Sequence, residues 1–179
     1  MRLPKVPDIA VRAIESGRRA RSRRPTHSDD VPTDALALRD ERVLLISVKP
    51  RYAEAILDGT KTVELRRTRP SLPDGSLILL YSSTPTRAVV GWARLKRVHE
   101  GTPEEIWDAL GDGAAIDAVA FDAYFEGAAA AFALQLDGVV EAARPVPLSV
   151  IRSIGIQPPQ SWRYLSKRVS HQIQATASG

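Results

Sequence analysis

One short stretch of the chain carries an amine, a carboxylate and a guanidinium behind a glycine, at Gly59, Lys61, Glu64 and Arg66. Glu64 and Arg66 are two residues apart, so on a β-strand their side chains share one face. A carboxylate accepts hydrogen bonds from the edge of a base, and a guanidinium fork fits phosphate oxygens. Lys61 adds a point charge for phosphate. These residue types indicate a site for nucleic acid or for a nucleotide.

The plain alternative is that these charges form an ion pair on the surface, which contributes little to stability. The neighbouring sequence favours a cleft, because three charges at the entrance of one strand, between apolar runs, are costly unless they line a solvated cavity. We therefore expect Lys61, Glu64 and Arg66 to converge on a cleft.

Two further segments combine aromatic and polar groups. In the first, Tyr81 could stack on a base while the hydroxyls of Ser82 and Ser83 donate to phosphate; the alternative is a turn whose hydroxyls are satisfied locally. The second segment, 158–165, could read or stack on a base, or its aromatic rings could anchor the chain to the core. The candidate ligand-binding residues are Lys49, Lys61, Glu64, Arg66, Tyr81, Ser82, Ser83, Gln160, Ser161 and Tyr164.

Catalytic patterns are weak in this sequence. The three histidines are far apart, and neither a Ser-His-acid arrangement nor a metal-ligand spacing is present. We expect no cofactor and no metal. An enzyme would have to use Lys61, with its pKa lowered by desolvation, or Glu64 as a general base in a metal-independent hydrolysis. The pattern favours a binding protein and leaves catalysis open.

Composition limits the class of protein. The chain has 179 residues, of which 44% are hydrophobic, enough to bury the core of one domain. It has no apolar run long enough to span a membrane. The absence of cysteine removes disulfides, thiolate metal sites and thiol nucleophiles. Because the first residues lack the apolar region of a secretion signal, we expect a cytoplasmic protein.

The positive charge is concentrated near the start of the chain. Residues 1–28 hold eight Lys or Arg and two acids, a net charge of +6, whereas the other 151 residues hold 17 and 19, a net charge of −2. We expect residues 1–41 to form a basic, disordered leader. The leader could be an electrostatic arm on nucleic acid or only a solvated tail. The high isoelectric point is therefore no argument for a basic domain surface.

Apolar periodicity predicts the elements that position the candidate site. Strands are expected at 43–48, 62–67, 76–82, 87–98 and 130–136, the last continued by or paired beside 139–143, with prolines 145 and 147 interrupting. Helices are expected at 50–58, 103–110 and 114–125, with a helical turn at 148–154.

This order predicts an α+β fold, in which five to six mostly antiparallel strands form a small β-barrel capped by short helices. We expect one domain over residues 42–166 and a polar tail over 167–179. Gly91 within its strand indicates a bulge or a close approach of another backbone.

The same residues resemble the ASCH domain, a branch of the PUA-like barrels marked by a G-x-K-x-x-E-x-R signature. The signature is complete here, from Gly59 to Arg66. The resemblance covers about 43–165 and includes 46–50, 81–85 and 158–164. It implies a barrel cleft that binds RNA, a nucleotide or a modified nucleoside.

Some small members of this family look like hydrolases that act on acylated cytidine or on RNA. In the amidohydrolase branch the motif lysine works with a threonine three residues later, where this chain has Glu64. The resemblance therefore supports a binding module and leaves a hydrolase using Lys61 and Glu64 as the alternative. An adaptor for a protein partner, with the cleft idle, is a third hypothesis.

Overall fold

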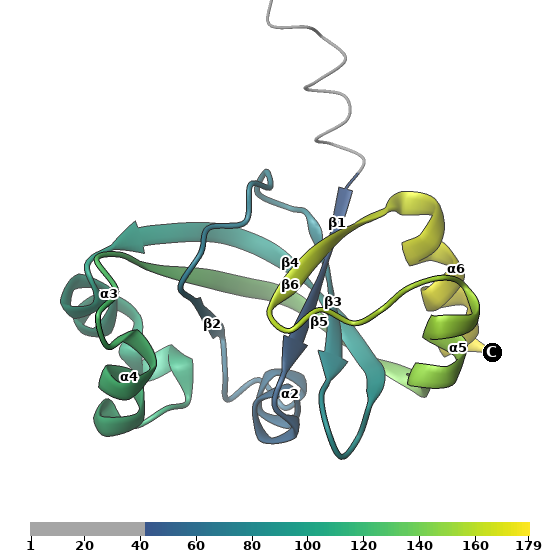
Figure 1. Cartoon of the computed structure of the whole chain (residues 1–179), viewed down its shortest axis with the longest axis horizontal. Helices are drawn as coiled ribbons and strands as arrows, with labels where there is room; N and C mark the ends of the chain where they lie inside the picture. The colour runs from purple at the N-terminus through teal and green to yellow at the C-terminus, as the bar shows by residue number, and fades with distance from the viewer. Residues whose placement is uncertain (1–41) are drawn as a thin grey trace, which may run out of the picture. The chain divides into compact units, whose positions relative to one another are not determined.

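The structure, a computed structural model, describes residues 42–179, so the expectations for residues 1–41 lie outside it (Figure 1). The strands are β1 (Arg42–Val48), β2 (Val63–Arg66), β3 (Leu77–Ser82), β4 (Ala88–Gly101), β5 (Ala131–Pro147) and β6 (Trp162–Ser166). The helices are α2 (Pro50–Leu57), α3 (Pro103–Leu110), the 3₁₀ helix η1 (Gly111–Ala114), α4 (Ala118–Phe125), α5 (Leu148–Ser153) and α6 (Lys167–Ser178).

The strands form one six-stranded sheet in the order β2-β5-β4-β3-β1-β6. Only the β1–β3 pair is parallel, and the other four pairs are antiparallel. The prediction of an α+β fold with mostly antiparallel strands is confirmed. The predicted barrel is wrong, because β2 and β6 remain at opposite edges of the described sheet and do not pair with each other.

The physical reason for the open edge lies in β2 itself. This strand has four residues and pairs with β5 on one side, and Thr62, the residue just before it, bonds both to β5 and to η1. The backbone N–H of Thr62 donates to the carbonyl of Gly113 at 2.9 Å. A Cβ on Gly113 would lie 2.6 Å from the Thr62 Oγ1, so only glycine permits this approach.

The long strands β4 and β5 bend because their pairing shifts register at three places. One shift lies beside Gly91, where a Cβ would come within 2.5 Å of the Val140 carbonyl oxygen. The bulge or close approach expected at this glycine is confirmed. β5 runs without a break through Pro145, which was expected to interrupt it, and ends at Pro147.

Alternating residues of the sheet pack under helices on both faces. On one face Ile46 joins the apolar cluster that contains Ile56 of α2. On the other face Leu45 joins the cluster that contains Ile151 of α5 and Ile173 of α6. α3 and α4 cover a third cluster beside β2 and β5, at the opposite end of the sheet from α5 and α6 in Figure 1.

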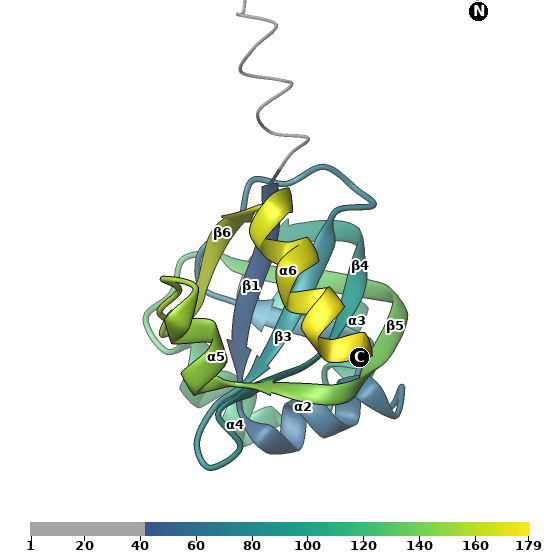
Figure 2. The same ribbon diagram turned by 90° about the vertical axis from the view of Figure 1, so that its right-hand side faces the viewer.

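The end of the chain differs from the expected polar tail. Residues 162–166 add strand β6 beside β1, and residues 167–178 form helix α6, which Figure 2 shows lying across the sheet. Ile173 and Ala177, four residues apart, are buried, and the Ser166 side chain accepts a hydrogen bond from the N–H of Val169 at the start of the helix. Two apolar residues at helical spacing thus suffice to dock this polar segment.

We expect the substitution Ile173→Ala to lower the free energy of unfolding by about 2 to 5 kcal/mol, because it leaves a cavity under α6. Urea denaturation of the full chain would measure this loss. Gln172→Ala, an exposed change on the same helix, is the control and should stay within about 0.5 kcal/mol of the parent chain. Equal stability of the two variants would contradict the docking of α6.

Candidate functional site

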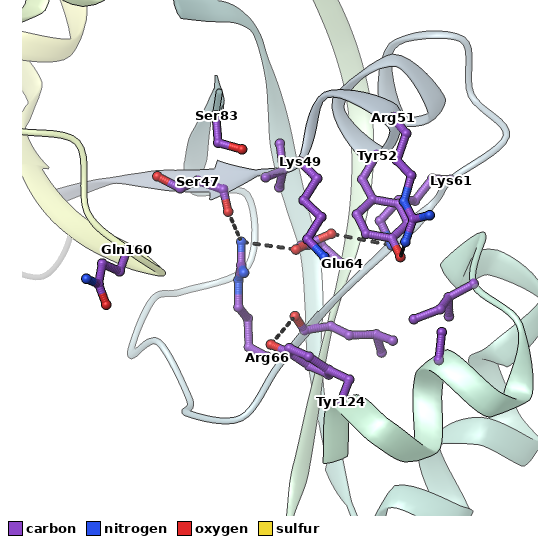
Figure 3. A pocket seen from close by; sticks show the side chains of 14 residues that line it. Ser47, Lys49, Arg51, Tyr52, Lys61, Glu64, Arg66, Ser83, Tyr124 and Gln160 are labelled. Carbon is purple, nitrogen blue, oxygen red and sulfur yellow. Dashed lines mark hydrogen bonds and ion pairs between the residues drawn. The ribbon is translucent and has the colours of Figure 1, made fainter. Parts of the chain in front are cut away.

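A pocket of about 400 Å³ opens where the carboxyl end of β1 meets α2, β2 and α4 (Figure 3). It is lined by Ser47, Val48, Lys49, Arg51, Tyr52, Lys61, Glu64, Leu65, Arg66, Ser83, Ile116, Ala120, Tyr124 and Gln160. Its volume falls in the range of small-ligand sites. The charged stretch identified in the sequence forms one wall.

The turn before β2 fixes the position of Lys61. Gly59 follows α2 with a φ of +83°, a conformation that glycine adopts without strain. The backbone N–H of Lys61 then donates to the carbonyl of Ala55 at 2.7 Å. These contacts hold the segment against the end of α2, so the lysine side chain enters the protein instead of the solvent.

The alternation along β2 separates apolar from charged residues. Val63 and Leu65 pack into the apolar cluster under α3 and α4. Glu64 and Arg66 point to the pocket side, and all four residues are buried. The shared face expected for Glu64 and Arg66 is confirmed.

Glu64 sits between two cations. Its Oε1 lies 3.0 Å from the Nη2 of Arg66, and its Oε2 lies 3.4 Å from the Nζ of Lys61. Each of the three side chains is at most 8% exposed. A surface ion pair is therefore excluded, and one carboxylate compensates two buried positive charges.

The Lys61 ammonium has further contacts. It donates to the carbonyl of Ala114 at the end of η1, and it lies 5.0 Å from the centre of the Tyr52 ring. Burial lowers the pKa of Lys61 below its ordinary value, and the attraction of Glu64 offsets part of this effect. The lysine therefore releases its proton more readily than one in water.

Arg66 retains an unused donor. Its Nη2 donates to the carbonyl of Ser47 at 3.1 Å as well as to Glu64. Its Nε is buried and has no hydrogen-bond acceptor within residues 42–179. A buried donor without an acceptor is costly, so an acceptor atom of a ligand would relieve this cost.

Tyr124 of α4 forms part of the opposite wall. Its hydroxyl donates to the carbonyl of Leu65 at 3.3 Å, as Figure 3 shows. Burial raises the pKa of Tyr124, so the phenol stays neutral at physiological pH. With Ile116 and Ala120 it gives the pocket an apolar side that suits a ring.

Exposed polar groups lie around the mouth of the pocket. Lys49, Arg51 and Gln160 are exposed, whereas Ser47 and Ser83 are half-buried. The four basic residues of the lining and its one carboxylate give a formal charge of +3. The pocket therefore attracts an anion, although residues 42–179 as a whole carry 16 Lys or Arg and 14 Asp or Glu, a net charge of only +2.

Six of the ten predicted site residues line this pocket: Lys49, Lys61, Glu64, Arg66, Ser83 and Gln160. The structure does not bring the other four to it. Side chains along β3 alternate between the two faces of the sheet, so Tyr81 packs with Leu79 in the apolar cluster on the α5 side. Ser82 is also buried. Ser161 is exposed and pairs through its carbonyl with the N–H of Ser47, while the Tyr164 hydroxyl donates to the Ser71 carbonyl.

The sequence reasoning missed several lining residues: Ser47, Arg51, Tyr52, Ile116, Ala120 and Tyr124. Arg51 and Tyr52 lie in the first turn of α2, two and three residues after Lys49, and this proximity was a usable signal. The face of α4 could not be assigned in the same way, because it lies far from the motif in sequence. Within the described part of the chain, no cluster of three or more His, Cys, Asp or Glu could hold a metal, and no helix could span a membrane.

We expect Glu64→Gln to lower the free energy of unfolding by about 3 to 5 kcal/mol, because Lys61 and Arg66 lose the charge that compensates them. Urea denaturation at neutral pH would measure the loss. The matched control is Glu100→Gln, which breaks an exposed ion pair with Arg69 and should cost at most about 1 kcal/mol. Similar losses in both variants would show that the Glu64 network is not a buried one.

Stability should also depend on pH through Lys61. Its pKa in the folded chain lies below the ordinary 10.5, so between these two values the unfolded chain binds more protons. The contribution of this group to stability is therefore constant below the folded pKa and rises from there toward pH 10.5. Urea titrations at increasing pH should show the parent chain gaining stability relative to Lys61→Met. A difference between the two that does not change with pH would contradict the lowered pKa.

Comparison with known proteins agrees with the motif and the fold. The sequence model of the ASCH domain matches residues 46–138. A relative named ASCH domain-containing ribonuclease, from Zymomonas mobilis, is 32% identical over 141 residues, which cover 78% of this chain and 95% of the relative.

Solved structures give the same result. The crystal structure of ASCH from Zymomonas mobilis aligns with a TM-score of 0.71 at 32% identity, over 76% of this chain and 95% of that one. Human THYN1, solved with DNA containing 5-methylcytosine, aligns with a TM-score of 0.50 at 9% identity over 77% of this chain and 98% of that one, which shows a shared fold alone. By its motif, its fold and these matches, the chain belongs to the ASCH domain family.

Proposed function

We propose that this chain binds single-stranded RNA in the pocket and cleaves it. The observation that carries the proposal is the buried network in which Glu64 holds Lys61 and Arg66 on one pocket wall. Such a network places two cationic groups at fixed positions in a partly desolvated site. Electrostatic preorganisation of this kind favours binding and reaction of a phosphodiester.

The mouth and the walls suit different parts of a nucleotide. Lys49 and Arg51 are exposed at the mouth and would hold phosphates on either side of the bound unit. The Tyr124 ring offers a stacking surface, and the Gln160 amide can pair with the edge of a base. A base that is paired within a duplex cannot enter such a pocket, so the RNA must be single-stranded where it binds.

Cleavage is favoured over simple binding by two observations. The relative from Zymomonas mobilis carries the name ribonuclease and matches over nearly its whole length. In this chain, the lowered pKa of Lys61 brings an amine closer to the range in which it exchanges protons at neutral pH. The presence of Glu64 where the amidohydrolase branch has threonine argues against hydrolysis of an acylated nucleoside.

The chemistry of RNA cleavage assigns roles to these groups. The 2′ hydroxyl loses its proton to water while its oxygen forms a bond to the adjacent phosphorus. The bond from phosphorus to the 5′ oxygen of the next nucleotide breaks, and that oxygen departs with a proton, which leaves a 2′,3′-cyclic phosphate and a 5′ hydroxyl. Arg66 would stabilise the negative charge on the phosphoryl oxygens, and Lys61 would supply the proton to the departing oxygen. Glu64 is a positioning residue, because it keeps both cations in place.

We expect Lys61→Met to reduce cleavage of a labelled single-stranded RNA by about a hundredfold or more, because the proton donor is lost. Gel analysis with and without Mg²⁺ and EDTA would measure the rate and report whether a divalent cation takes part. Lys96→Met, an exposed change on β4 outside the pocket, is the matched control and should cleave like the parent chain.

RNA binding, measured separately from cleavage, tests each of the two activities on its own. Circular dichroism would first establish that each variant folds. Arg66→Ala should weaken RNA binding, and equal binding by this variant and the parent chain would rule out the pocket. Binding that depends on Arg66 without any cleavage by the parent chain would make the protein a binding module only. Equal cleavage by the parent chain and Lys61→Met would remove the lysine from the reaction.

A further inference from the structure

A second cavity, of about 490 Å³, is lined by residues from the start of β1 and the start of α6, two elements that Figure 2 shows next to each other. Arg42 is the first residue of β1 and Val48 is the last, so the ends of the strand are about 20 Å apart. The second cavity is lined by Arg42, Val43, Pro73, Asp74, Gly75, Ser76, Leu77, Arg94, Lys167, Ser170, His171 and Gln174. None of these residues lines the pocket that contains Lys61.

The lining of this cavity includes four basic residues from three elements. Arg42 comes from β1, Arg94 from β4, and Lys167 and His171 from α6. Asp74 is the one acidic residue of the lining, so the formal charge is +2 with His171 neutral, from three cations and one carboxylate. Residues 42–179 carry the same net charge of +2 over their whole length. The cavity is thus a local concentration of positive charge, like the first pocket.

The two arginines are held in place but keep donors available. The Arg42 guanidinium carbon lies 4.5 Å from the centre of the Tyr164 ring, and its Nε is buried without an acceptor among the described residues. The Nη1 of Arg94 donates to the Gly75 carbonyl at 3.2 Å. A guanidinium has five N–H donors, so each group can still bind an anion.

The other polar groups of the lining are less available. Lys167 and His171 are four residues apart and share one face of α6. The Ser170 hydroxyl between them donates to the Lys167 carbonyl at 2.8 Å. The N–H groups of Gly75 and Ser76 already donate to backbone carbonyls. A ligand would therefore be held by the basic side chains, which select an anion with several acceptor oxygens.

We propose that this cavity is a second phosphate-binding site, separate from the pocket that contains Lys61. Planar guanidinium forks fit phosphate oxygens, and Lys167 of α6 adds a further positive charge. The phosphate can belong to the backbone of an RNA that extends past the first pocket, or it can be free in solution. A nucleotide confined to the first pocket does not reach this site.

The test measures binding of inorganic phosphate, and of a single-stranded RNA long enough to span both cavities, to the full chain by calorimetry. The double variant Arg94→Ala/Lys167→Ala should bind at least one of the two probes about tenfold more weakly, because two charge-assisted contacts are lost. Arg97→Ala, another exposed arginine of β4 that lines neither cavity, is the matched control. Lys167→Glu alone is a second variant, because no hydrogen bond of the Lys167 side chain is seen among residues 42–179.

The probes distinguish the source of the phosphate. Weaker binding of the long RNA by the double variant identifies a phosphate of the RNA backbone, and weaker binding of inorganic phosphate alone identifies a free anion. Binding of inorganic phosphate that is retained by Arg66→Ala and lost by the double variant would separate this site from the first pocket, which also attracts anions. Affinities for both probes that are unchanged in the double variant and in Lys167→Glu would overturn the proposal.

Discussion

The Glu64 carboxylate is the interaction on which the rest of the candidate site depends. It lies between Lys61 and Arg66, and the side chains of all three residues are buried. Two cations that close together would repel each other, and their desolvation would favour unfolding of the wall that carries them. With the carboxylate present, the same wall is both stable and positively charged. Binding capacity and local stability therefore come from one set of contacts.

The sequence predicted those parts of the structure that depend on local patterns. The buried strand β1, the short helix α2 and the opposed faces of β2 follow from periodicity within a few residues, and the motif from Gly59 to Arg66 located the charged wall. The barrel was wrong because closure depends on whether distant edge strands meet. Helix α6 was missed because its apolar positions are few, and its stability comes from the tertiary contact of Ile173.

The wall of the site formed by α4 could not be predicted from local sequence patterns either. Tyr124 is 59 residues away from Leu65, whose carbonyl its hydroxyl contacts, and no local pattern connects them. Tyr81, in contrast, was predicted to bind the ligand although it does not line the pocket. It follows an apolar run and precedes hydroxyl residues, yet the alternation of β3 places its ring in the core. Polar composition near a strand end indicates a site only when the direction of each side chain is known.

The segment that contains α3, η1 and α4 connects β4 to β5 and supplies the apolar wall of the pocket, whereas β2 supplies the charged wall. The two walls pack against each other through the apolar cluster that contains Val63 and Leu65, and the Lys61 ammonium of one wall donates to the main-chain carbonyl of Ala114 in the other. Because this contact with the ion network uses a main-chain oxygen, exchange of the pocket-lining side chains of Ile116 and Ala120 does not remove it. Substitutions at these two positions would therefore change the shape of the pocket while its anion-binding wall stays fixed.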